Sequence, residues 1–426
     1  MRALVEKFVD VRGDTELRGL LWSIAYGFLI MSSYYILRAV RDEIGAADQR
    51  NLQLLWTAVF FVMLLAVPLY SWAASRWSRG VFVPLANRFF IACLIAFWLS
   101  LVLLPESARP WIDRVFYVWT SVFALFVVSV FWGFMADCFS NEQGKRLFAT
   151  IAVGSSIGAM LGSTITAALA TVVPVFALLL IACIPLEAAS WCALVLHRRF
   201  ATGDVKSEGG AEKAIGGNAW SGMKAVFASR YLMGIAAFIA IMTFISTVLY
   251  FQQSALIYDA IADRGERRAL LAKMDWAVNF LTIIFQVYLT ARIVKWLGVG
   301  LTLALVPAII TSGFVLFGLY PTLAVLIVVQ VAYRAGRYGL TKPAREMLWT
   351  VLGREDKYKA KPFLDAAVYR GGDLASAWIY RGLEAIGLSI AAISLVAAPV
   401  AGLWALLALR LGRLEKELAN SEGEST

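Results

Sequence analysis

Long apolar segments alternate with short polar segments along almost the whole chain. Each apolar segment holds about 20 residues with few charges, the length that an α-helix needs to cross the hydrocarbon core of a bilayer. Because backbone groups in lipid must be satisfied internally, the pattern predicts an all-α polytopic membrane protein. We expect twelve spans, at residues 19–40, 52–74, 82–104, 112–136, 146–171, 174–197, 230–253, 274–294, 300–319, 321–340, 363–386 and 388–410.

The twelve spans divide into two groups of six at one polar segment rich in glycine, serine, lysine and glutamate. The predicted parts are an N-terminal half, a cytoplasmic linker, a C-terminal half and a cytoplasmic tail, at residues 1–197, 198–229, 230–410 and 411–426. Similar basic turns ending in glycine follow the second span of each half, at 75–80 and 291–298. This weak repeat favours the two-half architecture of major facilitator-like transporters, in which substrate binds between the halves.

The composition agrees with a membrane location and narrows the list of partners. Hydrophobic residues make up 60% of the chain and charged residues only 16%, so a soluble globular protein is excluded. The net charge is +10, but most lysine and arginine residues lie in alternate loops, as the positive-inside rule requires. We therefore expect the cell inner (plasma) membrane, both termini in the cytoplasm, and no nucleic-acid partner.

The chemistry-bearing residues give no signature of an enzyme. Four cysteines and one histidine are present, and none has the spacing of a metal site or a disulfide framework. No Ser/His/Asp set is evident. We expect no cofactor, no metal and no catalytic residue, and we predict a monomer whose partners are a small-molecule solute and the lipid bilayer.

Charged side chains inside the predicted spans are the strongest indication of function. An arginine at bilayer depth costs roughly 2.5–3.5 kcal/mol on insertion scales, so it usually faces a partner or a water-filled cavity. Tyr34, Arg38 and Arg41 fall on one stripe of the first span, and Tyr35 is adjacent. Guanidinium groups bind phosphate and carboxylate, and aromatic rings can stack on a ligand ring. The stripe predicts an anion site, with snorkelling of the arginines to the headgroups as the alternative.

The middle spans add polar candidates. The fourth span contains Trp132 and ends at Asp137, which is either interfacial or the partner of an intramembrane arginine. The eighth span begins with Asp275 and, one turn later, Asn279. The charged segment 257–273 is interpreted as an external amphipathic helix.

The eleventh span is the most polar. Arg370, Asp373 and Arg381 share one helical face, and Arg370 with Asp373 can alternatively form a structural pair. Gly371 and its neighbour Gly372 predict a helix break or a close approach. In the tenth span we assign Arg337 to snorkelling. Three glycines of the fifth span at four-residue spacing predict close helix packing, and they are Gly154, Gly158 and Gly162.

Several runs resemble the non-mitochondrial ATP/ADP translocases of plastids and intracellular bacteria. In the first span, Tyr35-Ile36-Leu37-Arg38 precedes Arg41-Asp42, where that family has Lys-Asp, and in the fourth span Phe131-Trp132-Gly133-Phe134 precedes Asp137, where it has Glu. Further matching runs are Lys145-Arg146-Leu147-Phe148, Pro343 to Met347, Lys357 to Asp365, and Arg370. The resemblance extends from the first span to the eleventh and implies a major-facilitator-like fold and nucleotide exchange.

The chain departs from that family at two charge positions. Asp373 falls where the family has a functional lysine, and the seventh span lacks the family's acidic residue. An additional acid disfavours a triphosphate and favours a less charged anion, a zwitterion or a proton-coupled solute.

We interpret the chain as a secondary active transporter for an anionic or zwitterionic metabolite, with nucleotide exchange as the activity that the resemblance implies. Arg38, Arg41 and Arg370 would hold the anionic group, aromatic residues would contact the rest, and the acids would pair with the arginines or carry a proton. The alternative is a membrane sensor or assembly protein that docks partners through the loops 198–229 and 341–362.

Overall fold

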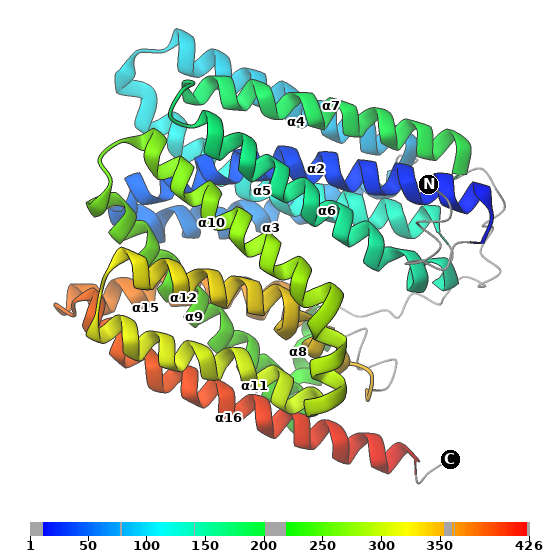
Figure 1. Ribbon diagram of the computed structural model, residues 1–426, viewed down its shortest axis with the longest axis vertical. Coiled ribbons are helices and arrows are strands. Elements are labelled where there is room, and N and C mark those ends of the chain that lie inside the picture. The colour runs from blue at the N-terminus through cyan, green and yellow to red at the C-terminus, as the bar shows by residue number, and fades with distance from the viewer. Residues whose placement is uncertain are drawn as a thin grey trace. The chain divides into compact units, whose positions relative to one another are not determined.

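A computed structural model describes residues 12–76, 79–139, 141–200, 219–352, 360–361 and 363–423. Over these residues the chain consists of helices and their connections, without a strand (Figure 1). This confirms the prediction of an all-α polytopic membrane fold. The linker 198–229 and the loop 341–362, which the sensor alternative requires for docking, lie partly outside the described residues.

The α-helices are α2 (Asp14–Ala47), α3 (Leu52–Arg76), α4 (Arg79–Leu103), α5 (Arg109–Cys138), α6 (Asn141–Leu169), α7 (Val175–Phe200), α8 (Ala219–Ala228), α9 (Arg230–Ala260), α10 (Arg264–Ile284), α11 (Thr290–Leu319), α12 (Leu323–Gly336), α13 (Lys342–Met347), α15 (Tyr369–Ala385) and α16 (Ile390–Gly423). Two short 3₁₀ helices are η1 (Gln49–Asn51) and η2 (Glu106–Ala108). Three π-helical segments are η3 (Phe285–Leu289), η4 (Arg337–Thr341) and η5 (Leu364–Val368).

Within the described residues, ten helical segments are long and apolar enough to cross a membrane. One of these segments, Arg264–Leu319, contains two of the twelve predicted spans, 274–294 and 300–319. A kink interrupts this segment where Gly298 adopts a φ of 76°. The predicted span 363–386 is absent from the ten, because the helix through η5 and α15 is rich in charges, including Asp365, Arg370 and Asp373.

The helices form two compact units. Unit 1 comprises residues 1–47, 61–208 and 261–280, and unit 2 comprises 48–60, 209–260 and 281–426. Each unit therefore includes residues from both sides of the predicted linker. The first part of α10 belongs to unit 1, and the first part of α3 belongs to unit 2. The division into halves at 198–229 stays a prediction.

In unit 1, α2 packs closely against α6 and α7. A Cβ atom built on Gly158 would lie 2.0 Å from the carbonyl oxygen of Phe28, and one on Gly162 would lie 2.3 Å from that of Ser32. Only glycine therefore fits where the two backbones touch. The Ser32 hydroxyl also donates to the Gly158 carbonyl at 2.9 Å. The prediction that these glycines serve close packing is confirmed.

In unit 2, α11 packs on α16, and α9 packs on α12, α15 and α16. The backbones of α11 and α16 touch at Gly300 and Gly412. The predicted break at Gly371 and Gly372 is wrong, because α15 continues through both residues. The alternative, a close approach, is correct, since a Cβ atom on Gly372 would lie 2.4 Å from the Thr243 hydroxyl of α9.

The predicted external helix over 257–273 is also wrong. Helix α9 continues to Ala260, and α10 begins at Arg264 and runs on to Ile284 without interruption. The charged side chains of this segment do not mark a surface helix, because Arg267 and Arg268 are buried. They are accommodated within unit 1 by a buried carboxylate, described below.

Candidate functional site

Arg38 of α2 is held between two carboxylates in unit 1. Its Nε atom lies 3.3 Å from Asp275 Oδ2 of α10 and 3.5 Å from Asp42 Oδ2 one helical turn later. The Arg38 side chain is 16% exposed and that of Asp275 only 2%. The guanidinium also lies over the Tyr35 ring, 5.4 Å from its centroid. An arginine placed in this way is charged, sheltered and still reachable, as an exchangeable anion ligand requires.

Arg41 is directed toward the interior of unit 1. Its guanidinium lies 4.9 Å from the centroid of the buried Tyr117 ring, and its Nε atom lies 3.7 Å from Asp42 Oδ1. The snorkelling alternative does not fit this position, because the guanidinium itself lies over an aromatic ring of α5. Asn279, also predicted for the site, lies one turn beyond Asp275 and donates to its backbone carbonyl at 2.8 Å.

The predicted aromatic residues separate into two groups. Tyr34 contacts the rings of Tyr35 and Phe123, with centroids 5.2 and 6.4 Å away. It therefore lies beside the Arg38 cluster. Trp132 instead contacts Phe131 and Phe148, at 5.0 and 5.6 Å. The side chain of Asp137 lies outside what the structure describes.

Unit 2 contains a second sheltered arginine, which the sequence interpretation missed. Arg337 begins the π-helical segment η4, and the rings of Tyr333, Tyr338 and Tyr369 surround its guanidinium at 6.0, 5.7 and 5.6 Å. The guanidinium donates to Ser246 Oγ at 3.1 Å and also bonds the Tyr369 hydroxyl. Assigning this arginine to snorkelling is wrong, because its guanidinium lies among three tyrosine rings and donates to Ser246. π-Helical turns are frequent at functional sites.

The charged residues of α15 lie next to this arginine. Arg370 Nη1 lies 3.8 Å from Asp373 Oδ2, so the structural-pair alternative describes them, although Arg370 remains 37% exposed. The Arg370 guanidinium also lies 5.9 Å from the Tyr369 centroid, so this tyrosine contacts two arginines. Arg381, in contrast, pairs with Glu384 at 2.7 Å near the end of the helix.

Seven of the ten predicted site residues form one group in each unit, Trp132 and Arg381 belong to neither group, and the Asp137 side chain lies outside the described residues. Tyr34, Tyr35, Arg38, Arg41 and Asn279 gather in unit 1, and Arg370 and Asp373 lie beside Arg337 in unit 2. That these groups act on one solute stays a prediction.

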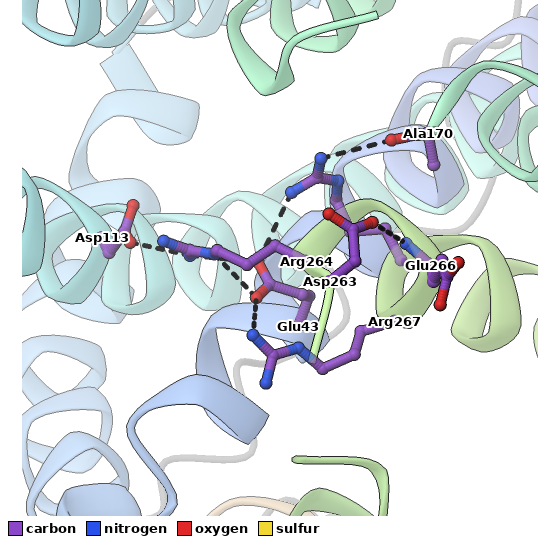
Figure 2. Close-up of polar contacts among 8 residues, drawn as sticks. Glu43, Asp113, Ala170, Asp263, Arg264, Glu266 and Arg267 are labelled. Atoms are coloured by element: carbon purple, nitrogen blue, oxygen red, sulfur yellow. Dashed lines mark hydrogen bonds and ion pairs between the residues drawn. The ribbon is translucent and has the colours of Figure 1, made fainter. Parts of the chain in front are cut away.

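A third charged cluster was not predicted at all. The fully buried carboxylate of Glu43, at the end of α2, accepts two hydrogen bonds from Arg264, at 2.8 and 3.0 Å (Figure 2). Arg267 and Arg268 reach the same carboxylate at 3.6 and 3.7 Å. Arg264 also bonds Asp113 of α5 at 2.8 Å. The available signal was the spacing of the three arginines on one face of a helix.

Among the residues that the structure describes, no group of histidine, cysteine, aspartate and glutamate could hold a metal ion. The chemistry that the described clusters offer is ionic recognition. An arginine that shares carboxylates can exchange one of them for the carboxylate or phosphate of a ligand without becoming an unpaired buried charge.

No protein-family model and no curated protein sequence matches this chain. Solved structures do match. The POT family transporter PepTSo aligns with a TM-score of 0.66 and 13% identity, over 94% of this chain and 98% of that one. A POT family transporter in complex with 5-aminolevulinic acid aligns at 0.64 and 12%, over 93% and 96%. A bacterial homologue of the human lysosomal transporter Spinster aligns at 0.58 and 14%, over 93% and 98%.

At these identities the matches show the fold, which is all-α, polytopic and major-facilitator-like. They extend over nearly the whole of each chain, so the likeness is not restricted to one helical bundle. The narrower resemblance to ATP/ADP translocases receives no support from these neighbours, and it stays a prediction.

Proposed function

We propose that this protein is a secondary active transporter for a small anionic or zwitterionic organic solute. The observation that carries the proposal is Arg38, a membrane-depth cation shared by Asp42 and Asp275 and covered on one side by Tyr35. A cation there is costly unless it is functional or permanently neutralised. Two carboxylates around one arginine also leave a negative charge that a solute amino group or a proton can balance.

The structural neighbours support this class of solute. They include POT family transporters, one in complex with 5-aminolevulinic acid and another with a thioalcohol-conjugated peptide. 5-Aminolevulinic acid carries an amino and a carboxyl group, and the Arg38 cluster offers a counter-charge for each. We favour a zwitterion over a nucleotide for the same reason, since Asp42 and Asp275 would repel a triphosphate.

In the mechanism that we propose, the solute carboxylate approaches Arg38 and replaces one of its two carboxylate partners. The released aspartate then takes a proton or the solute amino group. Arg337 and Arg370 of unit 2, which share Tyr369, hold the solute during the alternate state. Transport follows the alternating-access model, in which the solute site opens to one side of the membrane at a time. We assign the protein to the inner (plasma) membrane, with the cytoplasmic termini that the loop charges predict.

The test is uptake into proteoliposomes that contain the purified protein. The solutes are 5-aminolevulinic acid, a neutral dipeptide, glutamate, ADP and ATP, each with and without a proton gradient. We expect saturable uptake of a zwitterion and its loss in Arg38→Gln. Arg38→Lys should recover part of the uptake, because lysine keeps the positive charge but lacks the planar guanidinium that binds a carboxylate through two N–H groups. Unchanged uptake by Arg38→Gln would refute the assigned site. Uptake of ADP and ATP alone would refute the zwitterion and favour the nucleotide alternative.

A further inference from the structure

A cavity of about 410 Å³ lies in unit 1, away from the residues assigned above. The turn between α6 and α7 and the start of α10 form most of its wall. Four of its lining residues carry charge, namely Arg109, Asp263, Arg264 and Arg268. The volume falls within the range of small-molecule sites, roughly 300–1,000 Å³. By the loop charges, this end of the unit faces away from the cytoplasm.

The arginines in this wall keep donor capacity. Arg268 is only 6% exposed, and its Nη2 atom donates to the Ala170 carbonyl at 3.3 Å. Its buried Nε atom has no hydrogen-bond partner among the described residues, and the same holds for the Nε atom of Arg109. Buried N–H groups of charged side chains are normally satisfied, so the described residues leave both guanidinium groups with an unused donor. The two Nε atoms are enclosed, and an acceptor in the cavity would meet the terminal nitrogens of these arginines.

The charge balance of the wall is positive. The Asp263 carboxylate accepts the backbone N–H of Glu266 at 2.8 Å (Figure 2) and is engaged in capping α10. Both Arg109 and Arg264 repel the Arg268 guanidinium. The lining residues Arg109, Arg264 and Arg268 carry three positive charges against the one negative charge of Asp263. Glu43 and Asp113 pair with Arg264 and Arg268. Arg109 forms no ion pair among the described residues, so a bound anion would balance its charge.

The start of α10 adds a second attraction. The helix begins at Arg264, and both Arg264 and Gly265 line the cavity. The first N–H groups of a helix and the positive end of its dipole favour a negative group near that terminus. The cavity thus offers two kinds of hydrogen-bond donor to a negative group, the first N–H groups of α10 and the guanidinium groups of its arginines.

We propose that this cavity binds a small oxyanion, a carboxylate or a phosphate, at a site separate from that around Arg38. The oxyanion accepts hydrogen bonds from Arg109 and Arg268 and lies against the first turn of α10. A solute that carries such a group and arrives from outside would therefore bind at the predicted external end of unit 1 before it reaches the Arg38 cluster. The inference goes beyond the proposed transport function and does not depend on it.

The experiment is isothermal titration calorimetry of the full-length protein in detergent, with sodium phosphate and sodium acetate at constant ionic strength and with sodium chloride as reference. We expect saturable binding of at least one oxyanion and at least tenfold weaker binding in Arg268→Gln and in Arg109→Gln. Arg109→Gln removes a repulsive neighbour of Arg268, so this variant should fold even if Arg268→Gln does not.

Two control variants distinguish this site from general charge attraction and from the Arg38 cluster. Arg114 stacks on Trp111, 5.1 Å from a ring centroid of its indole, near the start of α5 but outside the cavity wall. Arg114→Gln should therefore bind as tightly as the parent, and an equal weakening would show general charge attraction and overturn the proposal. Arg38→Gln removes any oxyanion bound at the Arg38 cluster, so the titration is repeated in that variant. The remaining binding should weaken at least tenfold when Arg268→Gln is added, and no remaining binding in Arg38→Gln alone would overturn the claim of a separate site. Absence of binding by both phosphate and acetate would refute the site altogether.

Discussion

Replacing Glu43 with glutamine removes the negative charge that Arg264, Arg267 and Arg268 share, while it keeps the size of the side chain. The Glu43 side chain is fully buried, and three guanidinium groups lie within 3.7 Å of it. Removing one member of a buried ion pair costs about 3–5 kcal/mol, because the charge left behind is uncompensated. Arg264 is 33% exposed and keeps Asp113, so water and that carboxylate reduce its share. We therefore expect the lower end, about 3 kcal/mol.

This energy corresponds to a measurable change in thermal stability. For a folding unit of roughly 150–250 residues, each kcal/mol shifts the Tm by about 2–4 °C, so Glu43→Gln should lower the Tm by about 6–12 °C. The protein's own thiols report the transition. All four cysteines fall within unit 1, and Cys192 is buried, so a thiol-reactive fluorophore labels it on unfolding.

The matched control is Glu266→Gln. Glu266 lies on the first turn of the same helix and its side chain is exposed, so the same substitution should change stability by no more than about 0.5 kcal/mol. If the two variants unfold within about 2 °C of each other, the shared carboxylate does not stabilise unit 1 and the reasoning from burial is refuted.

Four further substitutions test individual contacts. Asp275→Asn should raise the KM for uptake of a zwitterion, because the solute amino group loses a counter-charge beside Arg38; an unchanged KM would contradict this. Gly158→Ala should cost about 1–3 kcal/mol, since its Cβ would meet a backbone carbonyl at 2.0 Å. Gly371→Ala, a helical position with nothing within 4 Å, should instead stabilise by about 0.5–1 kcal/mol, and thermal unfolding compares the two. Tyr369→Phe should weaken solute affinity several-fold in equilibrium binding with little change in Tm, and equal affinity would remove this hydroxyl from the site.

The spans could be predicted because a bilayer imposes length and apolarity on any helix that crosses it. The same rule explains the errors. The charges of 257–273 predict a surface helix, because hydropathy cannot show that Arg267 and Arg268 have a buried partner, Glu43, more than two hundred residues earlier. The kink at Gly298 was expected as the loop between two spans, and the structure keeps helix on both sides of it.

The site was partly predictable for a similar reason. Arg38 was identified because its depth in the first span requires a partner, and the structure supplies Asp42 and Asp275. Arg337 was missed because its position near a span end fits snorkelling. The local periodicity of the sequence also does not predict a π-helical turn at this position. Such a turn changes the face on which the following side chains lie, so α-helical spacing does not predict that Arg337 lies among Tyr333, Tyr338 and Tyr369.

The composition of unit 1 has a consequence for how the chain is made. Its α2 to α7 leave the ribosome before α10 exists, so Glu43 enters the membrane more than two hundred residues ahead of the arginines that it binds. At about 5–20 residues per second, this interval lasts roughly 10–45 s. During translation the first six spans are thus an incomplete folding unit. A chain cut within the predicted linker would leave that carboxylate without Arg264, Arg267 and Arg268, so co-expression of both fragments, and not the first fragment alone, is the arrangement that can restore unit 1.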